Sequence, residues 1–315
     1  MSDGADLLIP FAMCSAPACS EAAARLALPR LQRLLALLAA SDADEGSADS
    51  LTPPHERLLA RRQGLPAAAD GLVPWAAAEA RGAGLAGEGW AWITPCHWRV
   101  ATDHVAMAPL ADMQLEGADS QALFDAMRPY FEGDGLVLEA VSPGRWLARG
   151  EVFRALPTAS LDRVAGRVID TWMPRSAEAR LLRRLQQEMQ MLLYTHPVND
   201  ARQQRGLLPV NSFWVSGTGT LADTPPAPSG SLQVADDLRE AALRDDAAAW
   251  SAAWSEIDAR EGERLLAALA RREPVRLTLC GERHARTWSG PAGGALRRIG
   301  HWLRPQPVAR TLETL

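Results

Sequence analysis

Residues 136–149 read Leu-Val-Leu-Glu-Ala-Val-Ser-Pro-Gly-Arg-Trp-Leu-Ala-Arg, and this stretch decides the expected fold class. Two strand-like runs, Leu136–Val141 and Arg145–Arg149, flank a Ser-Pro-Gly segment that is typical of a tight turn. A hairpin of this kind pairs its strands antiparallel. Elsewhere strand-like and helical segments alternate along the chain, as they do in α/β proteins. The two patterns together predict an α/β protein with a mixed β-sheet flanked by helices.

Two further segments give the expected domain organisation. The clearest helix is predicted over residues 176–195, with Ser176 as its N-cap and apolar residues at helical spacing. The segment 223–231, Asp-Thr-Pro-Pro-Ala-Pro-Ser-Gly-Ser, has the composition of a linker or an exposed loop. We therefore expect a main α/β region over 1–222, which includes the Trp-rich strands and the long helix. The C-terminal helices and strand over 232–315 are expected to pack on the same sheet.

The composition is that of a globular chain with restricted chemistry. Hydrophobic residues make up 47% of the 315 residues and charged residues 23%, which indicates an ordinary hydrophobic core. Eleven Trp against five Phe and two Tyr predict that indoles supply much of the burial, and each indole N–H needs a partner. Lysine is absent, so all 33 basic residues are arginines. This excludes Schiff-base lysines, P-loop lysines and lysine general bases.

The cysteines and the termini suggest a cytoplasmic protein. Four scattered cysteines without a C-x-x-C motif predict reduced thiols rather than a disulfide framework. They are Cys14, Cys19, Cys96 and Cys280. The N-terminus is acidic where a signal peptide would be basic. No window holds 18 uninterrupted apolar residues, so we expect no membrane span.

A literal G-x-G-x-x-G match covers Gly82–Gly87. The dinucleotide fingerprint requires a strand before the glycines and a helix after them. Here a helical Ala/Glu run precedes the match and a Trp-rich strand follows it. We therefore do not interpret it as a dinucleotide site.

The segment 94–104 gathers possible metal ligands. Cys96, His97, Asp103 and His104 lie within nine residues, and all four side chains can ligate a metal ion. On one straight strand His97 and Asp103 would share a face, and Cys96 and His104 would share the other. A bend at Pro95 would bring them together. His97, Asp103 and His104 are the candidate metal ligands, and the alternative is a hairpin with satisfied histidines.

Residues 208–219 are a candidate ligand-binding segment. In this segment the polar pair Asn211-Ser212 is followed by an apolar strand and a Gly-rich turn. Its candidate residues are Asn211, Ser212, Gly217 and Gly219. A glycine turn allows the backbone to approach a ligand closely. The alternative is a tight strand-to-loop turn with an ordinary Asn cap.

A second candidate site follows the predicted buried strand Val275–Cys280. Ligands of open α/β sheets bind at strand ends, and the residues after this strand can together bind a phosphate or carboxylate. They are Glu282, Arg283, His284 and Arg286. Cys280 itself is expected to pack in the core.

Charge is distributed unevenly although the net charge is −5. Residues 236–263 hold nine acids and three arginines, whereas residues 271–310 hold nine arginines and two glutamates. The two segments either face each other or are both solvated. A basic surface for phosphate or nucleic acid is the alternative.

Five segments carry a resemblance to a known family: TPCHW (94–98) with TDH (102–104), PTASLDRV (157–164), RLLRRLQQEMQMLLYTHPVNDAR (180–202), LPVNSFWVSGTG (208–219) and LTLCGERHAR (277–286). They resemble the RpfE-type regulatory proteins of proteobacteria, which are often labelled cofactor-independent phosphoglycerate mutase-like. The resemblance covers most of the chain. It implies kinship with the alkaline-phosphatase-like metalloenzymes. Their Asn-x-x-Trp-x-x-Gly-x-Gly pattern resembles the arrangement of Asn211, Trp214, Gly217 and Gly219 in this chain.

The chain departs from those metalloenzymes at their metal ligands. Their first strand leads to a metal-binding Asp-Gly, whereas the strand here ends in Pro10-Phe11-Ala12-Met13-Cys14, and no D-x-x-x-H motif is present. Two divalent ions need more carboxylate and imidazole ligands than these motifs supply. The resemblance thus implies a degenerate alkaline-phosphatase-like scaffold.

Three functions remain open, and the sequence leaves undecided whether the protein is an enzyme. The first is an RpfE-type regulatory or binding protein that lacks phosphomutase catalysis and holds an anionic small molecule or a protein partner. The second is a metal-dependent phosphoglycerate mutase or phosphatase-like enzyme that uses a divalent metal. The third is a nucleic-acid accessory protein that uses the basic stretch 271–310 with Trp288 and Trp302.

Overall fold

A computed structural model describes residues 4–67, 69–85, 87, 89–221, 232–291 and 307–315. The chain forms two compact units. Unit 1 comprises residues 1–49, 53–62 and 228–315, and unit 2 comprises residues 50–52 and 63–227. This division differs from the expected boundary at residue 222, because the first strand takes its hydrogen-bond partners from the last third of the chain. The expected linker 223–231 lies outside the described residues.

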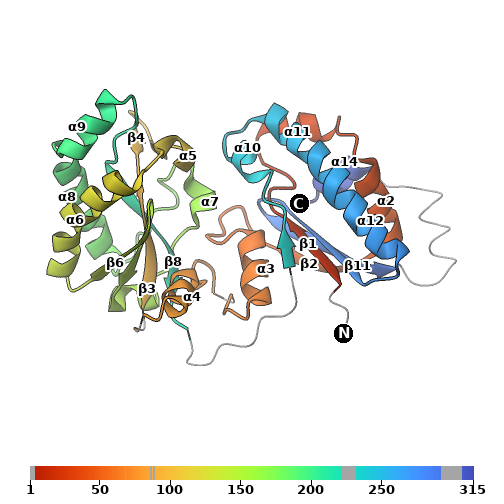
Figure 1. Ribbon diagram of the computed structural model, residues 1–315, viewed down its shortest axis with the longest axis horizontal. Coiled ribbons are helices and arrows are strands. Elements are labelled where there is room, and N and C mark those ends of the chain that lie inside the picture. Colours follow the sequence, from red (N-terminus) through yellow and green to blue (C-terminus); the bar gives the residue numbers. More distant parts are fainter. Residues whose placement is uncertain (1–3, 68, 86, 88, 222–231, 292–306) are drawn as a thin grey trace. The chain divides into compact units, whose positions relative to one another are not determined.

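Unit 1 is built on a five-stranded mixed sheet with the order β2-β11-β10-β1-β9 (Figure 1). Strand β1 (Ala5–Ile9) pairs in parallel with both β10 (Val275–Cys280), which is the central strand, and β9 (Leu232–Val234). Strand β11 (His284–Pro291) is antiparallel to β10 and to β2 (Leu38–Glu45). The predicted mixed α/β architecture is thus confirmed. Its antiparallel part in this sheet comes from β10, β11 and β2, and not from the hairpin 136–149.

Helices cover both faces of this sheet. The face that carries Leu8 and Cys280 packs against Leu58 and Leu59 of α3 (Pro54–Arg62). On the other side lie α2 (Pro29–Leu37), α11 (Ala247–Ile257) and α12 (Glu263–Ala270), as Figure 1 shows. The short helices of this unit are α1 (Pro17–Ala23), α10 (Arg239–Leu243) and α14 (Val308–Leu312). Residues 292–306 lie outside the described part of the chain.

A buried carboxylate caps helix α2 from a distant segment. Asp258 opens a π-helical turn, Asp258–Gly262, that joins α11 to α12. Its Oδ1 and Oδ2 accept hydrogen bonds from the backbone N–H groups of Leu31 (2.7 Å) and Arg30 (3.3 Å). A Cβ at Gly262 would lie 2.7 Å from the Cβ of Arg30, so the glycine allows this close approach. Asp258 therefore supplies the cap that the N-cap residue of α2, Leu28, cannot provide.

Replacing Asp258 with alanine is expected to lower the free energy of unfolding by about 1–3 kcal/mol, because two N–H groups at the start of α2 lose a charged acceptor. Chemical denaturation measures this loss. The matched control is Glu263→Ala, since Glu263 contacts Arg30 from a position that is 70% exposed and is expected to contribute less than about 1 kcal/mol. Equal losses in both variants would contradict the capping role.

Unit 1 also corrects the expectation of reduced thiols. Cys14 and Cys19, with Cα atoms 6.0 Å apart, form a disulfide. Cys96 and Cys280 are free and buried. Burial raises the pKa of both thiols, so they stay protonated and act as core residues. For Cys280 this agrees with the expected packing role.

Unit 2 is built on a four-stranded antiparallel sheet with the order β6-β7-β3-β8. The hairpin 136–149 forms its edge as β6 (Val137–Ser142) and β7 (Arg145–Arg149). The central strand β3 (Trp90–Cys96) pairs with β7 on one side and with β8 (Ser212–Gly219) on the other. The expected hairpin is thus present, within a separate antiparallel sheet.

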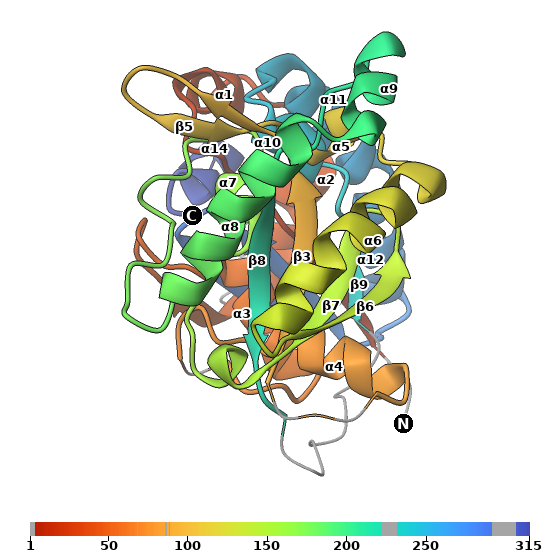
Figure 2. The same cartoon turned by 90° about the vertical axis from the view of Figure 1, so that its left-hand side faces the viewer.

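Two helices cover one face of this second sheet. Figure 2 shows α6 (Gly117–Gly133) and α8 (Arg180–Tyr194) lying across the strands. The predicted helix over 176–195 corresponds to α8, which begins four residues later than expected. The shared core contains side chains from the strands and from both helices, among them Ile93, Phe213, Val215, Met127, Phe131, Leu185 and Met189. The remaining elements of unit 2 are α4 (Trp75–Gly82), β4 (Trp98–Val100), β5 (Val105–Met107), α5 (Leu110–Met113), a 3-10 turn (Glu151–Arg154), α7 (Leu161–Val164) and α9 (Pro197–Gln204).

The tryptophans behave largely as the composition predicts. Six indole N–H groups donate to a carbonyl, carboxylate or hydroxyl oxygen, and these belong to Trp90, Trp92, Trp146, Trp214, Trp250 and Trp254. Trp250 donates to the carbonyl of Phe11 over 2.9 Å, where the backbone takes the left-handed value φ 53°. Buried indoles therefore hold irregular backbone as well as fill the core.

Within the described residues, no helix combines the length and the apolar character needed to cross a membrane.

Candidate functional site

The expected ligand residues of segment 208–219 lie in unit 2, and the first of them, Asn211, has structural partners. Asn211 clamps β4 to the start of β8: its Oδ1 accepts from the N–H of Trp98 (2.7 Å) and its Nδ2 donates to the carbonyl of Trp98 (2.8 Å). Ser212 is fully buried, and its hydroxyl has no hydrogen-bond partner in the described part of the chain. The amide of Asn211 is thus occupied by backbone groups, which favours the alternative of an ordinary Asn cap.

The two glycines of this segment are explained by backbone conformation and packing. Gly217 has φ 64° and Gly219 has φ 139°, values that residues with a side chain rarely adopt. A Cβ at Gly217 would lie 2.9 Å from Cε3 of Trp92, and one at Gly219 would lie 3.0 Å from Cβ of Pro74. Close packing against neighbouring side chains therefore accounts for both glycines.

The metal-ligand candidates His97, Asp103 and His104 do not bring their ligand atoms together within 4.8 Å in the described residues. The segment is not one straight strand: residues 98–107 form the hairpin β4–β5, with Asp103 and His104 in its turn. The Nδ1 atom of His104 contacts Oδ1 of Asp103 at 2.7 Å, and that of His97 contacts the carbonyl of Pro209 at 2.8 Å. These three residues do not fit one shared metal site.

The pKa values of this segment follow from the same contacts. Burial lowers the pKa of His97, against the opposing effect of its hydrogen bond to Pro209, so the ring is held neutral. The hydrogen bond from His104 lowers the pKa of the exposed Asp103 carboxyl. His196 is the N-cap of α9, where its Nδ1 accepts from the N–H of Val198 over 3.3 Å.

The other expected ligand residues lie in unit 1, at the turn between β10 and β11. Here the C-terminal residue packs against the turn. The N–H of His284 donates to the carbonyl of Leu315 (2.7 Å), and the N–H of Gly46 donates to Nδ1 of His284 (3.4 Å). A Cβ at Gly281 would lie 2.6 Å from the carbonyl carbon of Leu315, so a side chain there would displace the C-terminus.

Glu282, Arg283 and His284 line a pocket of about 390 Å³ beside the disulfide. Glu313 lines the same pocket. Two glutamates thus line the pocket together with the arginine and the histidine. Because carboxylates repel anions, this pocket does not favour the binding of an anion.

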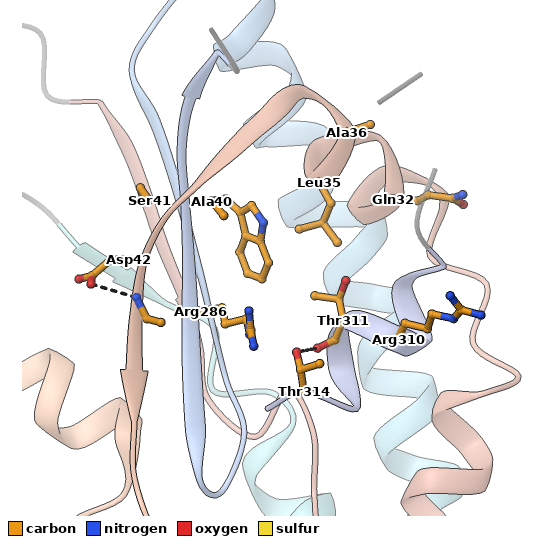
Figure 3. Close-up of a pocket in the computed structure, with 12 residues that line it drawn as sticks. Gln32, Leu35, Ala36, Ala40, Ser41, Asp42, Arg286, Arg310, Thr311 and Thr314 are labelled. Atoms are coloured by element: carbon orange, nitrogen blue, oxygen red, sulfur yellow. Dashed lines mark hydrogen bonds between the residues drawn. The ribbon is translucent and has the colours of Figure 1, made fainter. Parts of the chain in front are cut away.

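Arg286 lines a different pocket, of about 410 Å³, which we call the α14 pocket (Figure 3). Its walls come from four elements of unit 1. Helix α2 contributes Gln32, Leu35 and Ala36, and β2 contributes Ala40, Ser41, Asp42 and Ala43. Strand β11 contributes Arg286 and Trp288, α14 contributes Arg310 and Thr311, and Thr314 follows that helix. The pocket therefore lies between the edge of the sheet and two helices.

Two arginines give the α14 pocket its positive charge. Neither Arg286 nor Arg310 forms an ion pair within the described residues, although both line the same cavity. By contrast, Asp44 binds both Arg57 and Arg61 nearby in unit 1. Asp42 is the single acid among the lining residues, and its Oδ1 accepts from the N–H of Ala43. The cavity can thus offer two unneutralised guanidinium groups to an anion.

The sequence identified Arg286 and the described structure adds Arg310 and Trp288. Arg310 lies within the basic stretch 271–310, but nothing in its neighbourhood signals a site. Trp288 was singled out for nucleic-acid stacking, whereas here it lines the α14 pocket. Residues 292–306 of that stretch, including Trp302, lie outside the described part of the chain.

Comparisons with known proteins give a distant structural similarity. No family model and no curated protein matches the chain. Among solved structures, the PH0037 protein from Pyrococcus horikoshii is similar at TM-score 0.44 and 13% identity, over 95% of this chain and 93% of that one. A cofactor-independent phosphoglycerate mutase from Thermoplasma acidophilum DSM 1728 is similar at TM-score 0.36 and 14% identity, over 99% of both chains. Similarities of this strength carry no conclusion about activity.

Proposed function

We propose that this chain is an RpfE-type regulatory protein that binds a small anion in the α14 pocket and does not catalyse phosphomutase chemistry. The observation that carries the proposal is the pair of arginines, Arg286 and Arg310, that lines one cavity without an acidic partner in the described residues. Guanidinium groups bind carboxylates and phosphates through charge-assisted hydrogen bonds. The five sequence segments that resemble the RpfE-type family support the regulatory assignment.

The polar groups around the two arginines suit an anionic ligand. Thr311 lines the pocket beside Arg310 on α14, and Thr314 lines it just after that helix (Figure 3). The hydroxyl of Thr314 donates its proton to the carbonyl of Thr311 over 2.7 Å, so the hydroxyl of Thr311 and the amide of Gln32 on α2 are the neutral groups that can donate to a ligand. A carboxylate or phosphate oxygen would therefore meet donors from two helices and one strand.

The absence of mutase activity is proposed from the residues that a mutase would need. Where the first strand of the alkaline-phosphatase-like metalloenzymes leads to a metal-binding Asp-Gly, this chain has Pro10-Phe11-Ala12-Met13-Cys14. His97 and His104 each have a local partner. A degenerate alkaline-phosphatase-like scaffold that retains an anion pocket accounts for both features.

Isothermal titration with 3-phosphoglycerate as probe tests the proposal. Arg286→Glu and Arg310→Glu are each expected to weaken binding at least tenfold, because a charge-assisted hydrogen bond contributes about 1.5–3 kcal/mol. The matched control is Arg33→Glu, which makes the same change of charge on the exposed surface of α2, outside this pocket. Equal weakening in the control would show that overall charge, and not the pocket, attracts the anion.

The same protein preparation tests catalysis. Incubation with 3-phosphoglycerate and Mn²⁺ is expected to give no 2-phosphoglycerate above the protein-free rate. Turnover of the ester would overturn the regulatory assignment. Steeply salt-dependent binding of single-stranded DNA with no binding of 3-phosphoglycerate would favour a nucleic-acid accessory protein instead.

A further inference from the structure

The walls of the α14 pocket are as informative as its charges. Apolar residues from three elements line the same cavity: Leu35 and Ala36 on α2, Ala40 on β2 and Trp288 on β11. In Figure 3 the side chain of Leu35 extends from α2 toward the cavity, and Arg286 approaches from the strand. The cavity therefore has an apolar part as well as a cationic part, which an inorganic anion would not use.

The size of the cavity supports the same conclusion. A volume of about 410 Å³ lies within the range of sites for organic small molecules, roughly 300–1,000 Å³. A compact inorganic anion bound to the arginines would leave most of this volume empty. The volume thus fits an organic anion whose body fills the apolar part.

Trp288 supplies the recognition element for that body. It is 8% exposed and lines the cavity, and its indole N–H has no hydrogen-bond partner in the described part of the chain. This distinguishes it from the six indoles that are anchored by a hydrogen bond. An indole face favours flat aromatic partners, and stacking of an aromatic base on such a side chain adds substantially to affinity.

We infer that the ligand of the α14 pocket is an aromatic anion, an inference that rests on the proposed function. The ring of this ligand packs against Trp288, and its phosphate or carboxylate binds Arg286 and Arg310. The two arginines and the indole come from β11 and α14, so one small molecule can contact both elements. Strand alternation places Arg286 and Trp288 on the same face of β11.

Two probe pairs that differ by the ring alone test the inference on the wild-type chain. Adenosine monophosphate is compared with ribose 5-phosphate, and phenyl phosphate with inorganic phosphate, by isothermal titration. The ring is expected to raise the affinity at least fivefold in each pair. Equal affinities within both pairs would overturn the inference while leaving anion binding intact.

Variants then assign the effect to Trp288. Trp288→Ala is expected to remove the gain from the ring and to change the affinity for ribose 5-phosphate less than twofold, whereas Trp288→Phe retains part of the gain. A ring effect that survives Trp288→Ala in a folded variant would overturn the role of Trp288. If no probe of either pair binds, or if Arg286→Glu has no effect on any of them, the proposed function itself fails.

Discussion

Replacing Asp119 with alanine is expected to lower the free energy of unfolding by about 3–5 kcal/mol, because it leaves a buried guanidinium without its counter-charge. The side chain of Arg202 is fully buried, and its Nη1 donates to Oδ2 of Asp119 over 2.7 Å. The same oxygen accepts from Nη2 of Arg205. The other N–H groups of Arg202 donate to the carbonyls of Leu208 and Met113. This network ties α6 to α9 and to the chain before β8. Urea denaturation followed by tryptophan fluorescence measures the loss.

Glu116 provides the matched control for this network. It contacts Arg205 at 3.5 Å, but its side chain is 69% exposed, so Glu116→Ala is expected to change the stability by less than about 1 kcal/mol. If Glu116→Ala lowered the free energy of unfolding as much as Asp119→Ala, the burial of Arg202 would not be the cause of the loss.

The second large effect is expected at Trp214. Trp214→Ala should lower the free energy of unfolding by about 3–5 kcal/mol, since it removes a large buried side chain and leaves a cavity. Trp214 is 1% exposed, packs with Cys96 and Ile169, and donates its indole N–H to the carbonyl of Ala159 over 2.9 Å. Thermal and urea denaturation both report this change.

Variants of Trp214 also test whether the segment 208–219 has a structural role or binds a ligand. If the segment is structural, Trp214→Phe recovers most of the stability, and the affinity for 3-phosphoglycerate remains that of the wild type. Tyr194→Ala, at a side chain that is 85% exposed, is the control and should change the stability by no more than about 0.5 kcal/mol. A selective loss of 3-phosphoglycerate binding in the stable Trp214→Phe variant would restore the ligand-binding interpretation.

Local sequence patterns predicted the helices and strands better than they predicted which strands pair with one another. The hairpin 136–149 and the helix α8 follow from alternation and helical spacing, which act over short distances. The pairing of β1 with β10 joins residues about 270 positions apart, and no local pattern encodes that choice. The prediction of a mixed sheet is confirmed, but the hairpin 136–149 is not part of that sheet. The antiparallel strands of the mixed sheet are β10, β11 and β2.

The candidate site shows the same limit. The position after a buried strand pointed to Arg286, because such positions commonly carry ligands. Its neighbours Glu282, Arg283 and His284 line a separate pocket of mixed charge. Arg310 was not found, since its role depends on the tertiary position of α14 and not on its flanking sequence. The disulfide between Cys14 and Cys19 does not follow from cysteine count and motif, since its formation depends on how the backbone folds between the two residues.

A ribosome that synthesises this chain releases β1 long before the partners of that strand exist. Strands β9 and β10 begin at Leu232 and Val275, so the apolar residues Leu7, Leu8 and Ile9 emerge into solvent without a sheet to join. Unit 2 is nearly contiguous in the sequence and is complete at residue 227, so it can fold while translation continues. An unpaired apolar strand invites association with other chains. Strand β1 therefore stays without its sheet partners until the last third of the polypeptide has been made.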